Sequence, residues 1–143
     1  MRELAISSAT MSELDCPELH SISVLVVDDD ADSREMLALV LERSGARVFM
    51  AESASEAVIV FQAERPSLLL LDLGLPDEDG FRLLHRLRAL VPHGRKIPAI
   101  ALTGYGSPED REQTRAAGFQ AHLVKPVALS EMLEVVVRVL RSK

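Results

Sequence analysis

The chain has 143 residues, of which 48% are hydrophobic, and its 16 Lys and Arg against 22 Asp and Glu give a net charge of −6. This length predicts one domain whose core is large enough to fold without a disulfide or a structural metal. The acidic balance, together with four Phe, one Tyr and no Trp, argues against a protein that binds nucleic acid, because both a positive field and a stacking platform are missing.

The cysteine content and the apolar runs bear on the cellular compartment. Cys16 is the only cysteine, so no disulfide can form within the chain, and a reducing cytoplasm is the expected setting. The apolar residues at the N-terminus are too few for a secretory signal. No run approaches the roughly 18 apolar residues that suggest a membrane span. We therefore expect a soluble, cytoplasmic protein without a membrane partner.

The first 22 residues differ in character from the rest of the chain. They carry many Ser, Thr and acidic residues with no apolar period, which predicts a flexible tail over residues 1–22 that is disordered or loosely docked on the domain. The regular pattern starts near Ser23. The sequence thus predicts a tail followed by one folded domain over residues 23–143.

From Ser23 onward, short apolar runs alternate with segments of helical periodicity. The first run, 24–27, is followed by apolar residues spaced as on a helix face, from Met36 to Leu41, and Gly45 closes that helix. The same cycle is repeated four more times. Further strands are predicted at 47–51, 68–71, 98–102 and 121–124, and further helices at about 55–64, 81–91, 108–117 and 129–141.

Several helix ends carry recognisable signals. Ser53 and Glu56 have the spacing of a capping box, and Gly118 is expected to terminate the fourth helix. Ala128 stands at the cap of the last helix and offers no side-chain oxygen to the free N–H groups, so Ser130 is a candidate for that role.

Five apolar strands without polar alternation, each followed by a helix, predict a parallel sheet that is buried on both faces. This is a doubly wound α/β fold. In such a fold the functional crevice lies beyond the carboxyl ends of the strands. The residues directly after each strand are therefore the candidates for a site.

The residues at the strand ends form a charged set. Crowded carboxylates raise each other's pKa unless a cation compensates, and Mg²⁺ is often held by one or two carboxylates plus a phosphoryl oxygen. A hydroxyl and an ammonium group could bind the remaining oxygens of a phosphoryl group. The set therefore indicates a site for a phosphorylated carboxylate, made from Asp28, Asp29, Asp30, Asp72, Thr103 and Lys125.

Some charged residues have simpler interpretations. Asp30 and Asp32 are expected to be acids that favour the first turn of a helix. Taken singly, the other residues of the set could form turns or solvated charges, but their joint occurrence favours the site. Three histidines have no metal-ligand spacing and are expected on the surface, namely His20, His85 and His93.

Four separated motifs contain the strand-end residues. They are Val26-Val27-Asp28-Asp29, Leu71-Asp72-Leu73-Gly74-Leu75-Pro76 with Asp79-Gly80, Ala101-Leu102-Thr103-Gly104, and Leu123-Val124-Lys125-Pro126. Together they resemble the response-regulator receiver domain of two-component signalling over about residues 23–141. The stretches around Thr103 and Lys125 are most similar to receiver modules of hybrid sensor histidine kinases. The resemblance implies a flavodoxin-like fold with a five-stranded sheet.

The resemblance implies a role for each matched acidic residue. Asp72 would accept the phosphoryl group. Asp28, Asp29, Asp72 and the backbone carbonyl of Gly74 would arrange a Mg²⁺ ion, some of them through water. Of the first pair, Asp29 would be the more direct ligand.

The other matched residues belong to the implied switch. Thr103 would contact a phosphoryl oxygen and reorient on phosphorylation, Lys125 would form the companion ion pair, and its peptide bond to Pro126 would be cis. His122 stands where many relatives have Tyr or Phe, whose ring is buried as the Thr moves. Because an unperturbed His titrates near pH 6.5, this switch could depend on pH.

The implied function is a single-domain relay that is not itself an enzyme. A histidine kinase or phosphotransfer protein would donate the phosphoryl group to Asp72, and a downstream protein target would read the change. One alternative is a Mg²⁺-dependent phosphohydrolase that forms an aspartyl-phosphate, although Gly74 stands where its general acid is expected. The other is a scaffold that works without phosphorylation. No output domain is expected, so output would pass through a partner.

Overall fold

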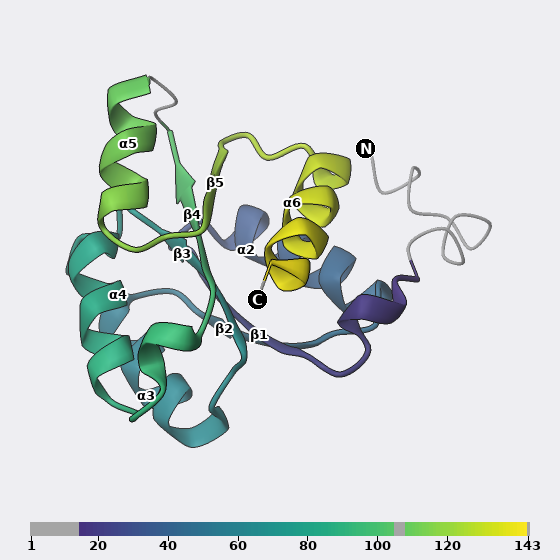
Figure 1. Cartoon of the computed structure of the whole chain (residues 1–143), viewed down its shortest axis with the longest axis horizontal. Coiled ribbons are helices and arrows are strands. Elements are labelled where there is room, and N and C mark those ends of the chain that lie inside the picture. Colours follow the sequence, from purple (N-terminus) through teal and green to yellow (C-terminus); the bar gives the residue numbers. More distant parts are fainter. Residues whose placement is uncertain (1–14, 105–107, 143) are drawn as a thin grey trace.

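The computed structural model describes residues 15–104 and 108–142, which form a five-stranded parallel sheet with helices on both faces (Figure 1). The strand order is β2-β1-β3-β4-β5, with all pairs parallel. This confirms the predicted doubly wound α/β fold. The strands are β1 (Ser23–Val27), β2 (Arg47–Ala51), β3 (Leu68–Asp72), β4 (Ala99–Thr103) and β5 (Ala121–Val124).

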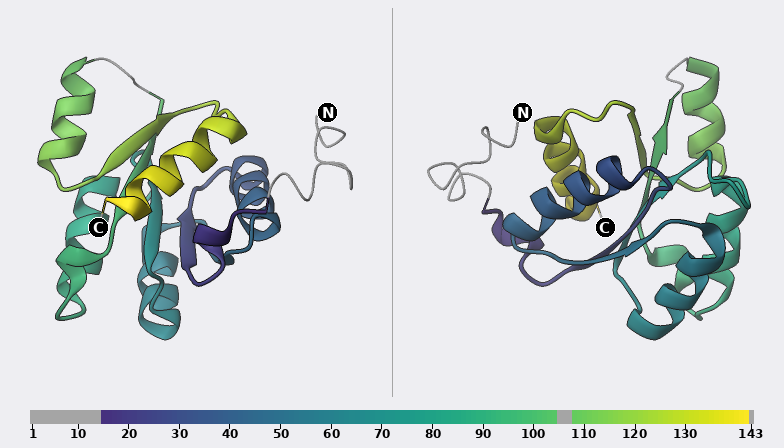
Figure 2. Two further views of the ribbon diagram at one scale, coloured as in Figure 1. Left: turned by 45° about the vertical axis from the view of Figure 1, so that its right-hand side comes forward. Right: turned by 180° about the vertical axis from the view of Figure 1, so that it is seen from behind.

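The helices divide between the two faces of the sheet. The two sets of helices can be followed on the two sides of the sheet in Figure 2. One apolar cluster joins the sheet to α2 and α6, and the other joins it to α3 and α4. No helix in the described ranges is long and apolar enough to cross a membrane. The helices are α2 (Ala31–Arg43), α3 (Ala54–Glu64), α4 (Gly80–Ala89), α5 (Pro108–Ala116) and α6 (Leu129–Arg141), with short 3₁₀ helices η2 (Pro17–Leu19) and η3 (Gly94–Lys96).

The central strands explain why the sequence has apolar runs without alternation. Every residue of β3 and of β4 is buried, and so are four of the five residues of β1. A strand covered by helices on both faces needs apolar side chains on both faces. Polar groups therefore appear only where these strands end, which is where the candidate site was predicted.

The predicted helix signals are confirmed in part. The Ser53 hydroxyl accepts the Glu56 N–H at 3.2 Å, while the Glu56 carboxylate accepts the N–H of Glu52 at 2.8 Å. At Ala128 no side chain caps α6. Gly118 follows α5 with φ +106°, a conformation that favours glycine.

Residues 15–22, which the sequence assigned to the tail, make contacts with the domain in the structure. Leu19 in η2 is fully buried in the cluster with α2 and α6. The Cys16 N–H donates to the Ser44 carbonyl at 3.0 Å, and Glu18 pairs with Arg141 of α6. One buried Leu in a three-residue helix creates no apolar period, so the sequence pattern gave no sign of it. The tail prediction for residues 1–14 falls outside the described residues.

Removing the Leu19 side chain should test this packing. We expect Leu19→Ala to lower the free energy of unfolding by about 2 kcal/mol, because a fully buried leucine is lost from a core. Leu90→Ala is the matched control, since Leu90 is 39% exposed, and it should change stability by less than about 0.5 kcal/mol. Urea unfolding measures both. Equal effects of the two substitutions would show that the segment does not hold to the domain in solution.

Candidate phosphorylation site

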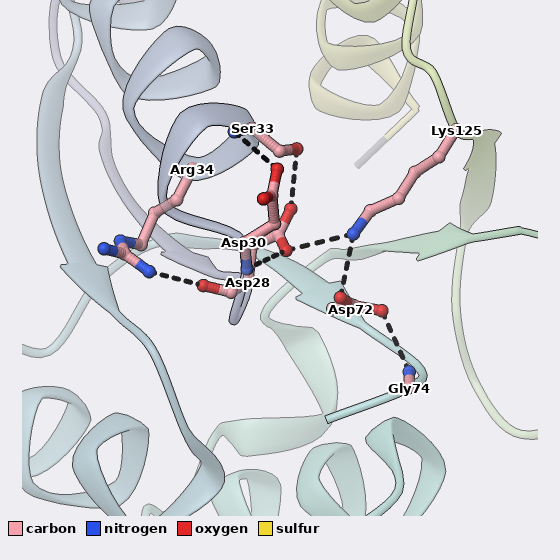
Figure 3. Close-up of polar contacts among 7 residues, drawn as sticks. All are labelled: Asp28, Asp30, Ser33, Arg34, Asp72, Gly74 and Lys125. Carbon is pink, nitrogen blue, oxygen red and sulfur yellow. Dashed lines mark hydrogen bonds and ion pairs between the residues drawn. The ribbon is translucent and has the colours of Figure 1, made fainter. Parts of the chain in front are cut away.

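The charged residues predicted from the strand ends lie together at one edge of the sheet. Asp28 follows β1, Asp72 ends β3, and Lys125 follows β5, and their side chains point toward one another (Figure 3). Thr103 ends β4 and is buried. The strand order brings them together, because β1, β3, β4 and β5 are consecutive in the sheet.

Lys125 links the two buried carboxylates. Its Nζ lies 3.0 Å from Asp28 Oδ1 and 2.9 Å from Asp72 Oδ2. Its backbone N–H donates to the Thr103 carbonyl at 2.8 Å, and the peptide bond to Pro126 is cis, as the resemblance implied. Burial by itself would lower the pKa of Lys125, but the bonds and charges of Asp72 and Asp28 outweigh burial and raise it. The ammonium group is therefore a fixed positive charge.

Asp28 is fully buried, and both oxygens of its carboxylate accept hydrogen bonds. Its Oδ1 also accepts the Asp30 N–H at 3.0 Å, and its Oδ2 accepts the Ser33 hydroxyl at 2.7 Å. Burial would raise the pKa of Asp28, yet these two donors and Lys125 together lower it. Asp28 is thus held as an anion whose oxygens are oriented by α2.

Asp72 has fewer donors and a different charge balance. Its Oδ1 accepts the Gly74 N–H at 2.9 Å, in addition to the Lys125 bond at Oδ2. Burial, and to a smaller extent the charge of Asp28, raises the pKa of Asp72 more than Lys125 and Gly74 lower it. Two neighbouring buried carboxylates are therefore not fully compensated by one ammonium group.

A third carboxylate completes an acidic cluster. Asp29 is exposed, and one oxygen each of Asp28, Asp29 and Asp72 can be chosen so that all three lie within 4.8 Å of one another. Carboxylate oxygens are the ligands that hard divalent cations such as Mg²⁺ prefer. The donor set and the uncompensated charge at Asp72 both fit such an ion.

The loop after β3 folds back toward the cluster. Gly74 forms an isolated antiparallel bridge with Asp79, and the Gly80 N–H donates to the Leu73 carbonyl at 3.1 Å. A Cβ on Gly80 would lie 2.6 Å from the Asp72 carbonyl oxygen and 2.8 Å from the Leu73 Cα. Only glycine lets α4 begin this close to the end of β3, so Gly80 sets the point at which the loop passes into α4.

Comparison with known sequences decides the family. The family model of the response regulator receiver domain matches residues 24–137. The chain belongs to this family, which is a family of signalling modules. An uncharacterized 14.6 kDa protein from the sodA1 3′ region of Leptolyngbya boryana is 44% identical over 118 residues, which cover 82% of this receiver and 89% of that protein.

Other relatives of the receiver are longer proteins. The KDP operon transcriptional regulatory protein KdpE of Escherichia coli is 34% identical over 110 residues, which are 77% of this chain and 47% of that protein. The probable transcriptional regulatory protein TcrX of Mycobacterium tuberculosis is 33% identical over 78% of this chain and 47% of its own length. The chain spans about half the length of these two regulators.

Solved structures agree with this assignment. A CheY-like response regulator receiver domain protein from Methanospirillum hungatei is 32% identical, with a TM-score of 0.75 over 85% of this chain and 94% of that chain. The chemotaxis response regulator CheY4 of Vibrio cholerae is 30% identical, with a TM-score of 0.75 over 82% and 98% of the two chains. The receiver therefore has the flavodoxin-like fold implied by its motifs.

A hollow lies beside the Asp72 carboxylate of the receiver. Its volume is about 310 Å³, and Asp72, Gly74, Thr103 and Gly104 contribute to its wall. A Cβ on Gly104 would meet no atom within 4 Å, which agrees with open space on this side of the site. Asp72 and Thr103 thus line the same hollow, and its volume is larger than a phosphoryl group needs.

His122 lies outside the acidic cluster. It lines a separate hollow of about 420 Å³ together with Arg111, Glu131 and Thr114, and the buried Thr114 also lines the hollow at Asp72. Burial and the charge of Arg111 lower the pKa of His122 more than Glu131 raises it. The neutral ring is therefore favoured at neutral pH. Whether His122 acts as the switch residue, and with what pH dependence, stays a prediction.

The three histidines that were expected on the surface are exposed in the structure. His20, His85 and His93 are exposed, and the His20 ring nitrogen Nε2 lies 2.6 Å from Asp15 Oδ1. The described residues form one cluster of metal-ligating side chains, and no histidine belongs to it. The expectation that these histidines are surface residues is confirmed for the described part of the chain.

Several residues shape the site although no sequence motif assigned them a role. Ser33 bonds the Asp28 carboxylate, and Arg34 donates to the Asp28 carbonyl at 2.8 Å. Their spacing of five and six residues from Asp28 places them on the first turn of α2, but only the position where α2 begins shows that they point back. Gly80 belongs to a quoted motif, and its close contact with β3 is visible only in the structure.

Proposed function

We propose that this receiver accepts a phosphoryl group on Asp72 from a phosphohistidine of a histidine kinase or phosphotransfer protein. The P–N bond of the phosphohistidine breaks, and a P–O bond forms at an Asp72 carboxylate oxygen. The observation that carries the proposal is the position of Asp72. It is 6% exposed, bonded to Lys125 and Gly74, and adjacent to two further carboxylates.

The proposal includes a Mg²⁺ ion held by Asp28, Asp29, Asp72 and the Gly74 carbonyl. A bound Mg²⁺ offsets the repulsion between the attacking carboxylate and the phosphoryl oxygens. The residues of the chain supply the rest. Lys125 holds one Asp72 oxygen and provides a second positive charge. The dense bonding of Asp28 keeps it anionic, so it can serve as a ligand.

Phosphorylation would then be read at the surface by a downstream protein target in the cytoplasm. The backbone bond between Lys125 and Thr103 ties β5 to the site. The hollow at Asp72 and the hollow at His122 share Thr114 of α5. A movement of Thr103 toward the added phosphoryl group would therefore alter the packing of α5 against β5 and the surface that a partner contacts.

Labelling with acetyl phosphate tests the proposal directly. The full chain, incubated with acetyl phosphate and MgCl₂, should gain the mass of one phosphoryl group, and peptide mapping should place it on Asp72. An excess of EDTA should suppress the labelling, because the ion offsets the charge of the incoming group. Labelling on a different residue would overturn the assignment of Asp72, and undiminished labelling in EDTA would overturn the role of the ion.

A further inference from the structure

The loop between β3 and α4, residues 73–79, contains the backbone group that the proposed ion needs. Gly74 is tied to the Asp72 carboxylate and forms a bridge with Asp79. The Gly80 N–H is bonded to the Leu73 carbonyl. These contacts join the loop to its own two ends. Its first part is also attached to the core, because the Leu73 N–H donates to the Leu102 carbonyl at 2.9 Å and the Leu75 side chain is buried in the cluster with α3 and α4. Neither of these two attachments involves the exposed second part of the loop around Asp77.

Asp77 joins this loop to a different element. Its Oδ1 accepts the Ala54 N–H at 2.9 Å, and its Oδ2 accepts the Ser55 N–H at 3.1 Å. These are the first two residues of α3, and they stand 23 and 22 residues before Asp77 in the sequence. The local cap Ser53 accepts the N–H of Glu56 instead. Asp77 thus accepts bonds at the start of α3 that the local cap does not make.

The start of α3 is a rigid point of attachment. Ala54, Ala57 and Phe61 of this helix are all fully buried in the cluster shared with α4 and the sheet. Asp77 is exposed, but the N–H of Ala54 above all lowers its pKa, so its carboxylate is charged at neutral pH. A charged acceptor at two N–H groups of a helix start holds more firmly than a neutral one.

We propose that Asp77 is a positioning residue for the phosphorylation site. Its two bonds to α3 hold the β3–α4 loop in place, so that Gly74 stays at Asp72 and its carbonyl remains available to the cation. Asp77 would act through Gly74 and would contact neither the ion nor the phosphoryl group. The part of the proposal that concerns the ion rests on the proposed function.

Three variants of the full chain separate a positioning role from a structural one. Asp77→Ala removes both bonds, and Asp77→Asn removes the charge but keeps one acceptor oxygen. Ser53→Ala is the matched control, because it removes a cap from the same helix without touching the loop. Urea unfolding should show that Asp77→Ala and Ser53→Ala both weaken α3 and lower the unfolding midpoint.

Two measurements should separate these variants. Titration with MgCl₂, followed by amide chemical shifts, should show about tenfold weaker binding for Asp77→Ala, an intermediate loss for Asp77→Asn and no change for Ser53→Ala. Without metal, hydrogen exchange of the Gly74 N–H should be about threefold or more faster in Asp77→Ala and unchanged in Ser53→Ala.

Other results of these measurements would contradict the positioning role of Asp77. Equal effects of Asp77→Ala and Ser53→Ala on Gly74 exchange would reduce Asp77 to a helix cap and overturn the proposal. Equal losses of Mg²⁺ affinity in Asp77→Asn and Asp77→Ala would assign the effect to charge, and this too would overturn it. A wild-type chain that binds no Mg²⁺ would contradict the proposed function, while the metal-free exchange would still decide whether Asp77 positions the loop.

Discussion

Replacement of Asp72 by Asn should abolish phosphoryl transfer to the chain while making the fold more stable. The amide oxygen has the shape of the carboxylate oxygen but is not a nucleophile, so no labelling by acetyl phosphate is expected. Removal of the Asp72 charge removes two unfavourable contributions to stability, namely the cost of burying that charge and its repulsion with Asp28. We expect the free energy of unfolding at pH 7 to rise by about 1 kcal/mol, the size of a typical single-site effect.

The gain in stability should depend on pH in a defined direction. Folding raises the pKa of Asp72, so the folded chain binds its proton more tightly than the unfolded chain does. The cost of ionising Asp72 is therefore present above its folded-state pKa and absent below the unfolded value of about 3.9. The stabilisation by Asp72→Asn should shrink as the pH falls from 7 toward 4.

Urea unfolding of Asp72→Asn at several pH values checks this prediction. Asp32→Asn is a suitable control, since Asp32 is an exposed acid in the first turn of α2. It should retain full labelling and show no comparable gain in stability. A gain for Asp72→Asn that stays constant with pH would show that ionisation of Asp72 does not cause it.

Replacement of Lys125 by Met should have the largest effect on stability. It removes the cation that lies 3.0 Å from Asp28 and 2.9 Å from Asp72. Two neighbouring buried carboxylates would then face each other without a fixed positive charge. We expect a loss of about 4 kcal/mol at pH 7, as for a buried ion pair that loses one partner.

The loss caused by Lys125→Met should be smaller under two conditions. Lowering the pH toward 4 favours the protonated form of Asp72, whose pKa is raised by burial, and so weakens the repulsion between the two carboxylates. Adding MgCl₂ supplies another cation, so the variant should gain more stability from the ion than the wild type does. Urea unfolding at pH 7 and pH 4, with and without MgCl₂, measures both effects.

Lys96→Met provides the matched control for Lys125→Met. Lys96 is an exposed lysine of η3, in the segment that leads into β4 rather than at the carboxyl end of a strand. Lys96→Met removes the same charge as Lys125→Met does, but it should change the free energy of unfolding by no more than about 0.5 kcal/mol. If Lys125→Met were as stable as Lys96→Met at pH 7, the ammonium group would not compensate the two carboxylates.

The order of the elements followed from the sequence because their signals are local. The apolar runs that became β1, β3 and β4 lack polar alternation because both faces of these strands are buried. Helix starts at Ser53 and helix ends at Gly45 and Gly118 also depend on neighbouring residues only. The packing of Leu19 was missed for the same reason, since a single buried side chain has no periodicity.

Some residues of the candidate site could likewise be predicted from local sequence signals, and others could not. Asp28, Asp72, Thr103 and Lys125 could be predicted, because parallel strands present their carboxyl ends at one edge. The contacts made by Ser33 and Asp77 could not, since they depend on where α2 begins and on how a loop meets a helix 22 residues earlier in the sequence. Their residue types are common and solvated elsewhere, so no local pattern marks them.

The sequence by itself determined the fold class, the acidic balance and the set of strand-end side chains, because each depends on composition or on short-range spacing. Only the tertiary structure decided how their charges are shared. In the folded chain Asp28 is an anion with several hydrogen-bond donors, whereas the pKa of Asp72 is raised. Both carboxylates accept hydrogen bonds from the same ammonium group, that of Lys125. Burial and donor geometry set these differences between identical side chains, and both arise only when distant segments pack together.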